Sequence, residues 1–210
     1  MEGSRPSDPH RLNIKPALNN QPSRLPLMLL ALFLLAAPAA RADDSAMWAL
    51  LKAPGHIVIL RHSNAPGATP EPYGINLKDC SIQRSLDDAG RAQARRIGDE
   101  FRKHGISKAR LVSSQFCRTL ETARLTGLGP VAELPALNQV FVPDLGGMRG
   151  TAEKTAKFMK MILPKQLTIL VSHVSNIQSI AGVNLSSGEM AVVHLDAAGA
   201  VAVDGRIMVP

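Results

Sequence analysis

The sequence contains only two cysteines and no excess of glycine, and these counts exclude several classes of protein. Of its 210 residues, 2 are cysteine, 16 are glycine and 15 are proline. A disulfide-rich scaffold and a collagen-like chain are therefore excluded, and two thiolates cannot complete a four-cysteine zinc site. An apolar fraction of 45% excludes a disordered chain, and a charged fraction of 20% excludes a polytopic membrane protein. The length fits one domain of ordinary size.

The N-terminal residues have the order of a secretory signal peptide. Arg24 precedes an apolar run, LPLMLLALFLLAA, over residues 25–37, and Pro38 and a small-residue site ending at Ala42 follow it. As a helix, this run would measure roughly 20 Å, which is shorter than the ~30 Å hydrocarbon core of a bilayer. The pattern therefore favours a cleaved signal over a permanent membrane anchor.

We therefore predict a signal peptide over residues 1–42 and a single mature domain over residues 43–210. The mature protein is expected to be periplasmic or secreted, with no stable membrane span after cleavage. Cleavage would remove five basic and two acidic residues and lower the formal net charge from +7 to +4. The remaining Lys and Arg residues are scattered among Asp and Glu, so we expect no nucleic-acid partner. A mild positive charge suits a small anionic substrate.

Export changes how the two cysteines are interpreted. In an oxidising compartment, Cys80 and Cys117 are the only possible intramolecular pair. A disulfide is the favoured interpretation, and two buried free thiols are the alternative. A bridge between them would stabilise the fold by about 3–4 kcal/mol in the chain-entropy model.

Strands alternate with helices along the mature chain. Residues 64–80 and 131–150 are rich in turn-forming residues and are expected to be irregular. The alternation predicts an α/β fold, a three-layer α/β/α sandwich with a mostly parallel sheet. The predicted strands cover residues 56–60, 109–113, 167–171, 190–195 and 201–209, and the predicted helices run from Ser85 or Asp87 to about Lys103, from Ser114 to about Gly127, over 151–162 and over 175–181.

Cationic and imidazole side chains follow three of these strands. Arg61 and His62 end the first strand, Arg118 comes shortly after the second, and His173 follows the third. Ligands of parallel α/β sheets bind beyond the carboxyl ends of the strands, where these four side chains converge. Arginine forks bind phosphate oxygens in pairs, and helix N-termini at the same edge favour an anion. The residues alone therefore predict a phosphate or sulfate site with histidine as the reactive group.

Four segments resemble the histidine phosphatase superfamily, whose members are phosphoglycerate mutase-like. They are VILRHSNAPG, QRSLDDAGRAQARRIGDEF, SSQFCRTLETA and LVSHVSNI. They occur in the family's order over roughly residues 56–195. The subgroup that the chain resembles most consists of small exported members without a large cap domain. The resemblance implies a histidine phosphatase-like fold.

The resemblance also implies roles for individual residues. His62 matches the nucleophile that becomes phosphohistidine, and Arg61, Arg118 and His173 match the rest of the phosphate pocket. A neutral His62 would attack phosphorus in line with the leaving oxygen. The two arginines and a cationic His173 would stabilise charge on the equatorial oxygens, so we expect no metal and no cofactor.

Two features depart from the family pattern. Ser63 follows the nucleophile where the family usually has glycine, and no carboxylate clearly matches the proton donor. Glu189 is the first candidate for that catalytic role, Asp144 is the second and Glu121 is a weaker third. The candidates for positioning the pocket are Ser114, Thr122 and Asn176.

The sequence therefore predicts an exported, metal-independent phosphomonoesterase that acts through a phosphohistidine on His62. Its expected partner is a small phosphorylated substrate, with envelope sugar phosphates suggested by analogy to exported relatives. The alternative is a catalytically weak or inactive phosphate-binding module of the same fold, which Ser63 and the unassigned proton donor would explain. A phosphomutase is disfavoured, because sugar-phosphate intermediates are scarce outside the cytoplasm.

Overall fold

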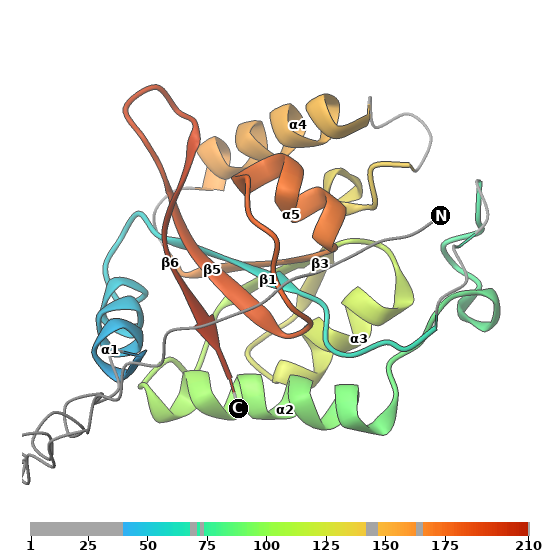
Figure 1. Cartoon of the computed structure of the whole chain (residues 1–210), viewed down its shortest axis with the longest axis horizontal. Coiled ribbons are helices and arrows are strands. Elements are labelled where there is room, and N and C mark those ends of the chain that lie inside the picture. The colour runs from blue at the N-terminus through green and yellow to red at the C-terminus, as the bar shows by residue number, and fades with distance from the viewer. Residues whose placement is uncertain (1–39, 68–70, 72–73, 142–146, 163–165, 210) are drawn as a thin grey trace, which may run out of the picture. The chain divides into compact units, whose positions relative to one another are not determined.

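The computed structural model describes residues 40–67, 71, 74–141, 147–162 and 166–209 (Figure 1). The predicted signal peptide lies outside this part of the chain except for its last three residues. Asp144, the second candidate for the proton donor, also lies outside it.

The sheet has six strands in the order β3-β2-β4-β1-β5-β6. The pairs β3–β2, β2–β4 and β4–β1 are parallel, whereas β5 runs antiparallel to both β1 and β6. This is the mostly parallel sheet that the sequence predicts, with a C-terminal hairpin at one side. The strands are β1 (Ile57–Arg61), β2 (Arg110–Ser113), β3 (Val131–Glu133), β4 (Thr168–Ser172), β5 (Glu189–Leu195) and β6 (Val201–Met208).

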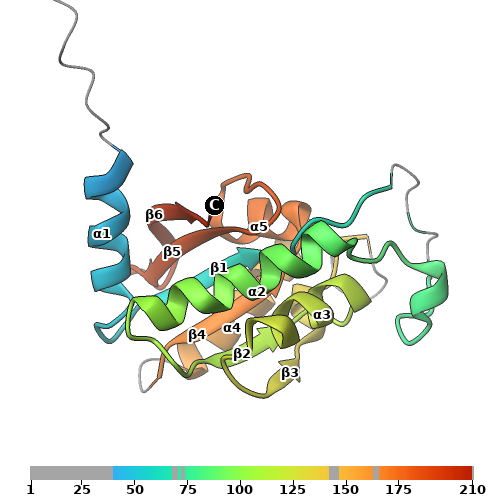
Figure 2. The same ribbon diagram turned by 90° about the horizontal axis from the view of Figure 1, so that it is seen from below.

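Helices cover both faces of the sheet, which confirms the three-layer α/β/α architecture (Figures 1 and 2). Along β1, Val58 and Leu60 pack among side chains of α1, α2 and α3, while Ile57 and Ile59 pack among those of α4 and α5. Both faces are apolar because successive side chains of a strand point to opposite sides. The helices are α1 (Ala40–Leu50), α2 (Asp88–Lys103), α3 (Cys117–Thr126), α4 (Gly147–Ile162) and α5 (Val174–Ala181), and two short 3-10 turns are η1 (Cys80–Ile82) and η2 (Pro135–Leu137).

Helix α2 begins and ends where its sequence predicts. The Asp87 side chain caps its N-terminus by accepting a hydrogen bond from the Gly90 amide at 2.6 Å. A Cβ at Gly90 would collide with the backbone carbonyl of Asn64, so glycine allows α2 to lie against the loop that follows β1. The start of α2 therefore supports the segment that contains the predicted nucleophile.

Four elements differ from the sequence-based prediction. Helix α4 begins at Gly147, four residues before the predicted start. Helix α3 begins at Cys117 with Phe116 at its N-cap, so Ser114 is not the cap, although the helix ends at Gly127 as expected. Strand β3 was expected to be irregular because its three residues lie in a segment rich in proline and glycine. Helix α1 was not predicted, although its Met47 and Trp48 are buried in the core and the Trp48 ring meets Phe101 edge-on at 5.0 Å.

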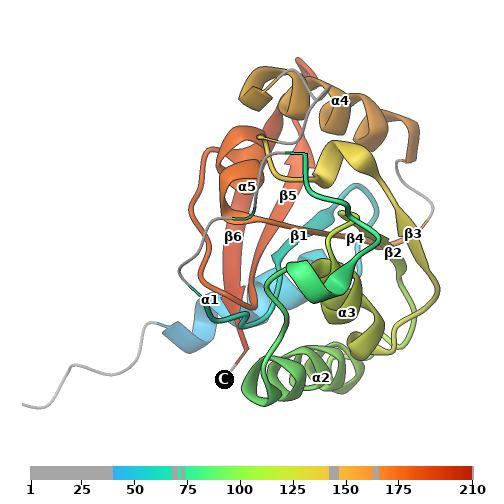
Figure 3. The same cartoon turned by 90° about the vertical axis from the view of Figure 1, so that its right-hand side faces the viewer.

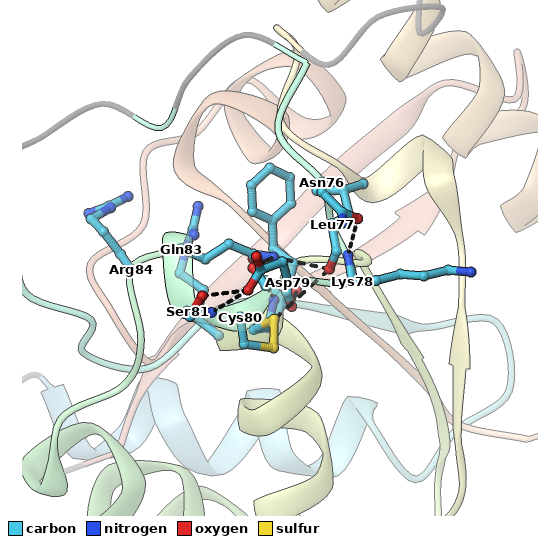
Figure 4. The surroundings of a disulfide bond; sticks show 12 residues. Asn76, Leu77, Lys78, Asp79, Cys80, Ser81, Gln83 and Arg84 are labelled. Atoms are coloured by element: carbon cyan, nitrogen blue, oxygen red, sulfur yellow. Dashed lines mark hydrogen bonds between the residues drawn. A yellow bond between two sulfur atoms is a disulfide. The ribbon is translucent and has the colours of Figure 1, made fainter.

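A disulfide joins Cys80 of η1 to Cys117, the first residue of α3, as the favoured interpretation predicts (Figure 4). The Cα atoms lie 5.7 Å apart and the cysteines are 37 positions apart in sequence. Next to the bridge, the Cys117 amide donates to the Gln83 side-chain oxygen at 2.9 Å. The irregular segment that follows β1 is thereby attached to α3 one residue before Arg118.

Replacing both cysteines by serine is expected to lower the free energy of unfolding by about 3–4 kcal/mol, because the bridge restricts the unfolded chain. Urea denaturation of the double variant Cys80→Ser/Cys117→Ser measures this loss. Wild-type protein in a reducing buffer serves as the control and should unfold at the urea midpoint of the double variant. Equal stability of the oxidised, reduced and substituted proteins would contradict the expected contribution.

Candidate active site

The carboxyl ends of β1, β2 and β4 bring the predicted site residues together at one edge of the sheet. Arg61 lies opposite Ser172 in the parallel β1–β4 pair, so the residues that follow, His62 and His173, are neighbours. Their ring centroids are 5.4 Å apart. Figure 3 looks toward the carboxyl end of β1 and shows the segment around η1 beside α3, which contributes Arg118. The structure therefore places both histidines and Arg118 in one cluster.

His62 is buried and neutral. Its Nδ1 lies 2.8 Å from the Ser63 carbonyl oxygen, which can only accept a hydrogen bond, so Nδ1 carries the proton. Nε2 then holds the lone pair. The pKa of His62 is lowered to about 3, mainly by burial and to a lesser extent by the charges of Arg118, Arg61 and Arg84. The hydrogen bond to Ser63 opposes this shift.

His173 is also neutral, because its partners fix its tautomer. Nδ1 lies 3.3 Å from Arg118 Nη2, and a guanidinium only donates, so Nδ1 accepts. Nε2 lies 2.7 Å from Ser114 Oγ and donates to it. Burial lowers the pKa of His173 well below its usual value, and the charge of Arg118 lowers it further. His173 is therefore neutral in this structure, and a cationic His173 acting on a bound phosphate stays a prediction.

Two arginines present buried N–H groups at this edge. Arg118 is 0% exposed, and its guanidinium carbon lies 4.7 Å from the centroid of the Phe116 ring. Arg61 is half-buried and donates through Nη1 to the Leu185 carbonyl at 2.8 Å. Within the described residues, the Nε of each arginine is buried and has no hydrogen-bond acceptor. Buried donors normally have a partner, so this arrangement suits a bound anion.

Two of the three predicted positioning residues contact the cluster. Ser114 binds His173, as described above. Thr122 Oγ1 accepts from the Ser63 amide at 3.0 Å and donates to the Arg118 carbonyl at 2.7 Å, so it joins the nucleophile's loop to α3. Asn176 instead donates to the Ala136 carbonyl at 3.2 Å and supports η2.

Glu71 is a site residue that the sequence did not reveal. Its carboxylate accepts hydrogen bonds from Nη1 and Nη2 of Arg118, and from Gln139 Nε2 at 3.2 Å. The side chain is only 4% exposed. Glu71 lies in the irregular segment that follows β1, where no periodic pattern indicates which side chains face inward.

Arg84 is a second residue that the sequence did not reveal. Its Nη1 donates to the carbonyls of Ala65 and Gly67 at 3.4 Å and 3.3 Å, and its Nε lies 3.9 Å from a Glu71 oxygen. The charge of Arg84 contributes to lowering the pKa of Arg61, as it does for both histidines. The pocket therefore contains a third arginine that the sequence analysis did not identify.

Glu189 and Glu121 are held by other partners. Glu189 starts β5, and its Oε2 accepts from the Ser186 amide at 2.6 Å. Its charge also raises the pKa of Arg61 against the effect of burial, which places the carboxylate near the pocket. Glu121 of α3 pairs with Arg91 of α2 at 2.7 Å. A role for Glu189 as proton donor stays a prediction.

No group of three or more His, Cys, Asp or Glu side chains in the part of the chain that the structure describes is arranged to hold a metal ion. No helix among the described residues has the length and apolar character needed to cross a membrane.

Several solved structures share the fold. The protein histidine phosphatase SixA, complexed with tungstate, is 17% identical with a TM-score of 0.52, over 72% of this chain and 96% of that one. A mycobacterial glucosyl-3-phosphoglycerate phosphatase is 13% identical with a TM-score of 0.53, over 72% and 98%. A phosphoserine phosphatase from Entamoeba histolytica is 12% identical with a TM-score of 0.55, over 73% and 96%. None of the curated proteins matches the chain.

The sequence itself matches a family model over more than half of its length. Residues 57–182 match the histidine phosphatase superfamily (branch 1). This range includes the four residues that the resemblance assigned to the phosphate pocket, while Glu189 lies beyond it. With the fold, the converging side chains and the matched range in agreement, the chain belongs to the histidine phosphatase superfamily.

Proposed function

We propose that the protein is a phosphomonoesterase that works through a phosphohistidine on His62. The observation that carries the proposal is the neutral, buried His62, whose Nδ1 donates to Ser63 and leaves a lone pair on Nε2. Beside it, Arg61 and Arg118 present buried N–H groups that suit phosphate oxygens.

The reaction would take place in two steps. In the first, His62 Nε2 attacks phosphorus, the bond to the leaving oxygen breaks, and the alcohol departs after taking up a proton. In the second, water attacks the phosphohistidine, the P–N bond breaks, and orthophosphate is released. Arg61 and Arg118 stabilise the charge on the equatorial oxygens in both steps.

His173 would respond to the substrate's charge. The pKa of its ring is low because the group is buried beside arginines. A phosphate dianion placed against the ring favours its charged form and raises this pKa. His173 would then take up a proton and add a donor to the phosphate, with Ser114 holding its Nε2.

The names of the solved structures support small phosphorylated substrates for the family. They describe phosphatases for protein phosphohistidine, glucosyl-3-phosphoglycerate and phosphoserine. Identities below 20% do not transfer any of these substrates to this chain. We propose a small phosphomonoester, with envelope sugar phosphates as the first class to test if the protein is exported.

A phosphate-binding module without turnover is the second candidate. The contact between Glu71 and Arg118 favours it, because a carboxylate already uses two donors that phosphate needs. Saturable binding of phosphate without hydrolysis of a broad panel of phosphoesters would support this alternative.

Replacing His62 by alanine is expected to lower hydrolysis of an aryl phosphate by about a thousandfold or more, because the covalent step is lost. Turnover without added metal, and trapping of an acid-labile, base-stable phosphoenzyme, measure this loss. Glu153→Gln, on the exposed side of α4, is a control that should keep wild-type turnover. Wild-type turnover in His62→Ala would show that the assignment of the nucleophile is wrong.

The neutral state of the two histidines makes stability depend on pH. Because the pKa of each is lower in the folded protein than the usual 6.5, only the unfolded chain takes up these protons below about pH 6.5. The free energy of unfolding should therefore fall as the pH drops from about 6.5 toward 3, by up to about 1.4 kcal/mol per pH unit for each histidine. Urea denaturation across this range measures the slope. His62→Gln should show a shallower slope than wild type, and identical slopes would contradict a neutral His62.

We also propose that the protein is exported. The signal-like pattern before Asp43 and the disulfide support this proposal, since disulfides persist in oxidising compartments. N-terminal sequencing of the protein from the periplasm or medium should begin at Asp43. Such cleavage would shorten α1 at its start and keep Met47 and Trp48 in the core. Recovery of the uncleaved chain from the cytoplasm alone would contradict export.

A further inference from the structure

Glu71 occupies the face of Arg118 that a phosphate would be expected to bind. Both carboxylate oxygens accept hydrogen bonds from the two terminal nitrogens of the guanidinium. This paired arrangement is the one that arginine offers to two oxygens of a phosphate. Arg118 also contacts the ring of His173, so the carboxylate is bound within the cluster rather than at its rim.

The charges around this contact suggest what can replace the carboxylate. Arg61, Arg84 and Arg118 supply three positive charges, Glu71 supplies one negative charge, and both histidines are neutral. These six side chains therefore carry a formal charge of +2, and the nearby Glu189 carboxylate, which raises the pKa of Arg61, makes the pocket less positive. A phosphomonoester dianion brings more negative charge to this cationic pocket than a carboxylate does. A monoanion brings no more charge than the carboxylate it would have to displace.

We propose that Glu71 is a specificity-determining residue, an internal anion that competes for Arg118 and restricts the pocket to dianionic phosphoryl groups. The inference rests on the phosphate pocket of the proposed function, although it does not require turnover. A ligand must bind Arg118 more strongly than the protein's own carboxylate does. Dianionic phosphate meets this condition, whereas carboxylates and phosphodiesters are rejected.

The surroundings of Glu71 give it other partners when Arg118 binds a ligand. Arg84 Nε lies 3.9 Å from one carboxylate oxygen, and the Arg84 amide lies 3.4 Å from it. Arg84 is 31% exposed, whereas Arg118 is fully buried. A carboxylate that moves from Arg118 toward Arg84 therefore keeps a counter-charge and gains contact with water.

If the ion pair between Glu71 and Arg118 has only a structural role, removal of Glu71 is expected to change the affinity for phosphate in the opposite direction. If Glu71 only positions Arg118, its removal should disorder the guanidinium and weaken binding. If Glu71 competes, its removal should strengthen binding, even though the fold loses stability because a buried cation loses its counter-charge. Affinity and stability then change in opposite directions.

Isothermal titration calorimetry with orthophosphate at pH 8 tests the proposal. Glu71→Gln keeps the shape of the side chain and removes its charge, and it is expected to bind orthophosphate about 10- to 100-fold more tightly than wild type. Glu71→Ala is a second variant with the same expected direction. Glu153→Gln, a carboxylate paired with Arg149 on the surface, is the matched control and should bind like wild type.

Acetate tests the selectivity directly. It carries the same group as Glu71 and a single charge. Acetate should compete with orthophosphate in Glu71→Ala and should have no measurable effect on wild type at the same concentration. Unchanged or weaker orthophosphate binding in both Glu71 variants, or equal competition by acetate in all proteins, would overturn the proposal.

Turnover of an aryl phosphate by wild type, measured in parallel, separates the two proposals. If wild type hydrolyses the ester and the Glu71 variants bind phosphate no more tightly, only the role of Glu71 is wrong. If the variants bind more tightly and no protein hydrolyses the ester, the role of Glu71 holds and the phosphatase proposal fails.

Discussion

The burial of one guanidinium organises the candidate site. Arg118 is 0% exposed, and a buried charge is stable only where its surroundings supply partners. Three neighbours of Arg118 supply such partners. The guanidinium lies over the face of the Phe116 ring, and it donates hydrogen bonds to the Glu71 carboxylate and to a ring nitrogen of His173. Each partner comes from a different segment, so pairing the charge of Arg118 also fixes the positions of these segments relative to one another.

The same requirement explains why the disulfide lies where it does. Cys117 precedes Arg118 at the start of α3, and Cys80 belongs to the irregular segment that contains Glu71 and Arg84. The described residues of this segment make few backbone hydrogen bonds with one another, such as that from the Asp79 amide to the Asn76 carbonyl. The covalent bridge restricts its path close to Arg118 and thereby holds the counter-charge near the guanidinium. Stability and anion recognition therefore depend on the same short stretch of chain.

Sequence patterns predicted the strands that position the two histidines, but they did not predict the charged loop residues that surround them. Runs such as HIVIL fix strand β1, and the parallel pairing of β1 with β4 then places His62 beside His173. Glu71 and Arg84 could not be predicted, because they lie in a loop whose path is set by tertiary contacts rather than by periodicity. The neutral state of His173 in the structure could not be predicted either, since it depends on burial and on the Arg118 hydrogen bond.

A carboxylate that pairs with a buried arginine of the candidate site links stability to the proposed selectivity. Without Glu71, the buried charge of Arg118 would rely on neutral partners, and the fold would bear the cost of desolvating it. With Glu71, every ligand must replace an ion pair that already satisfies the guanidinium. Only an anion with more charge than a carboxylate binds Arg118 more strongly than Glu71 does. In this proposal, the residue that stabilises the buried charge of Arg118 therefore also selects the ligand. The proposed preference for dianionic phosphate is thus a consequence of burying Arg118.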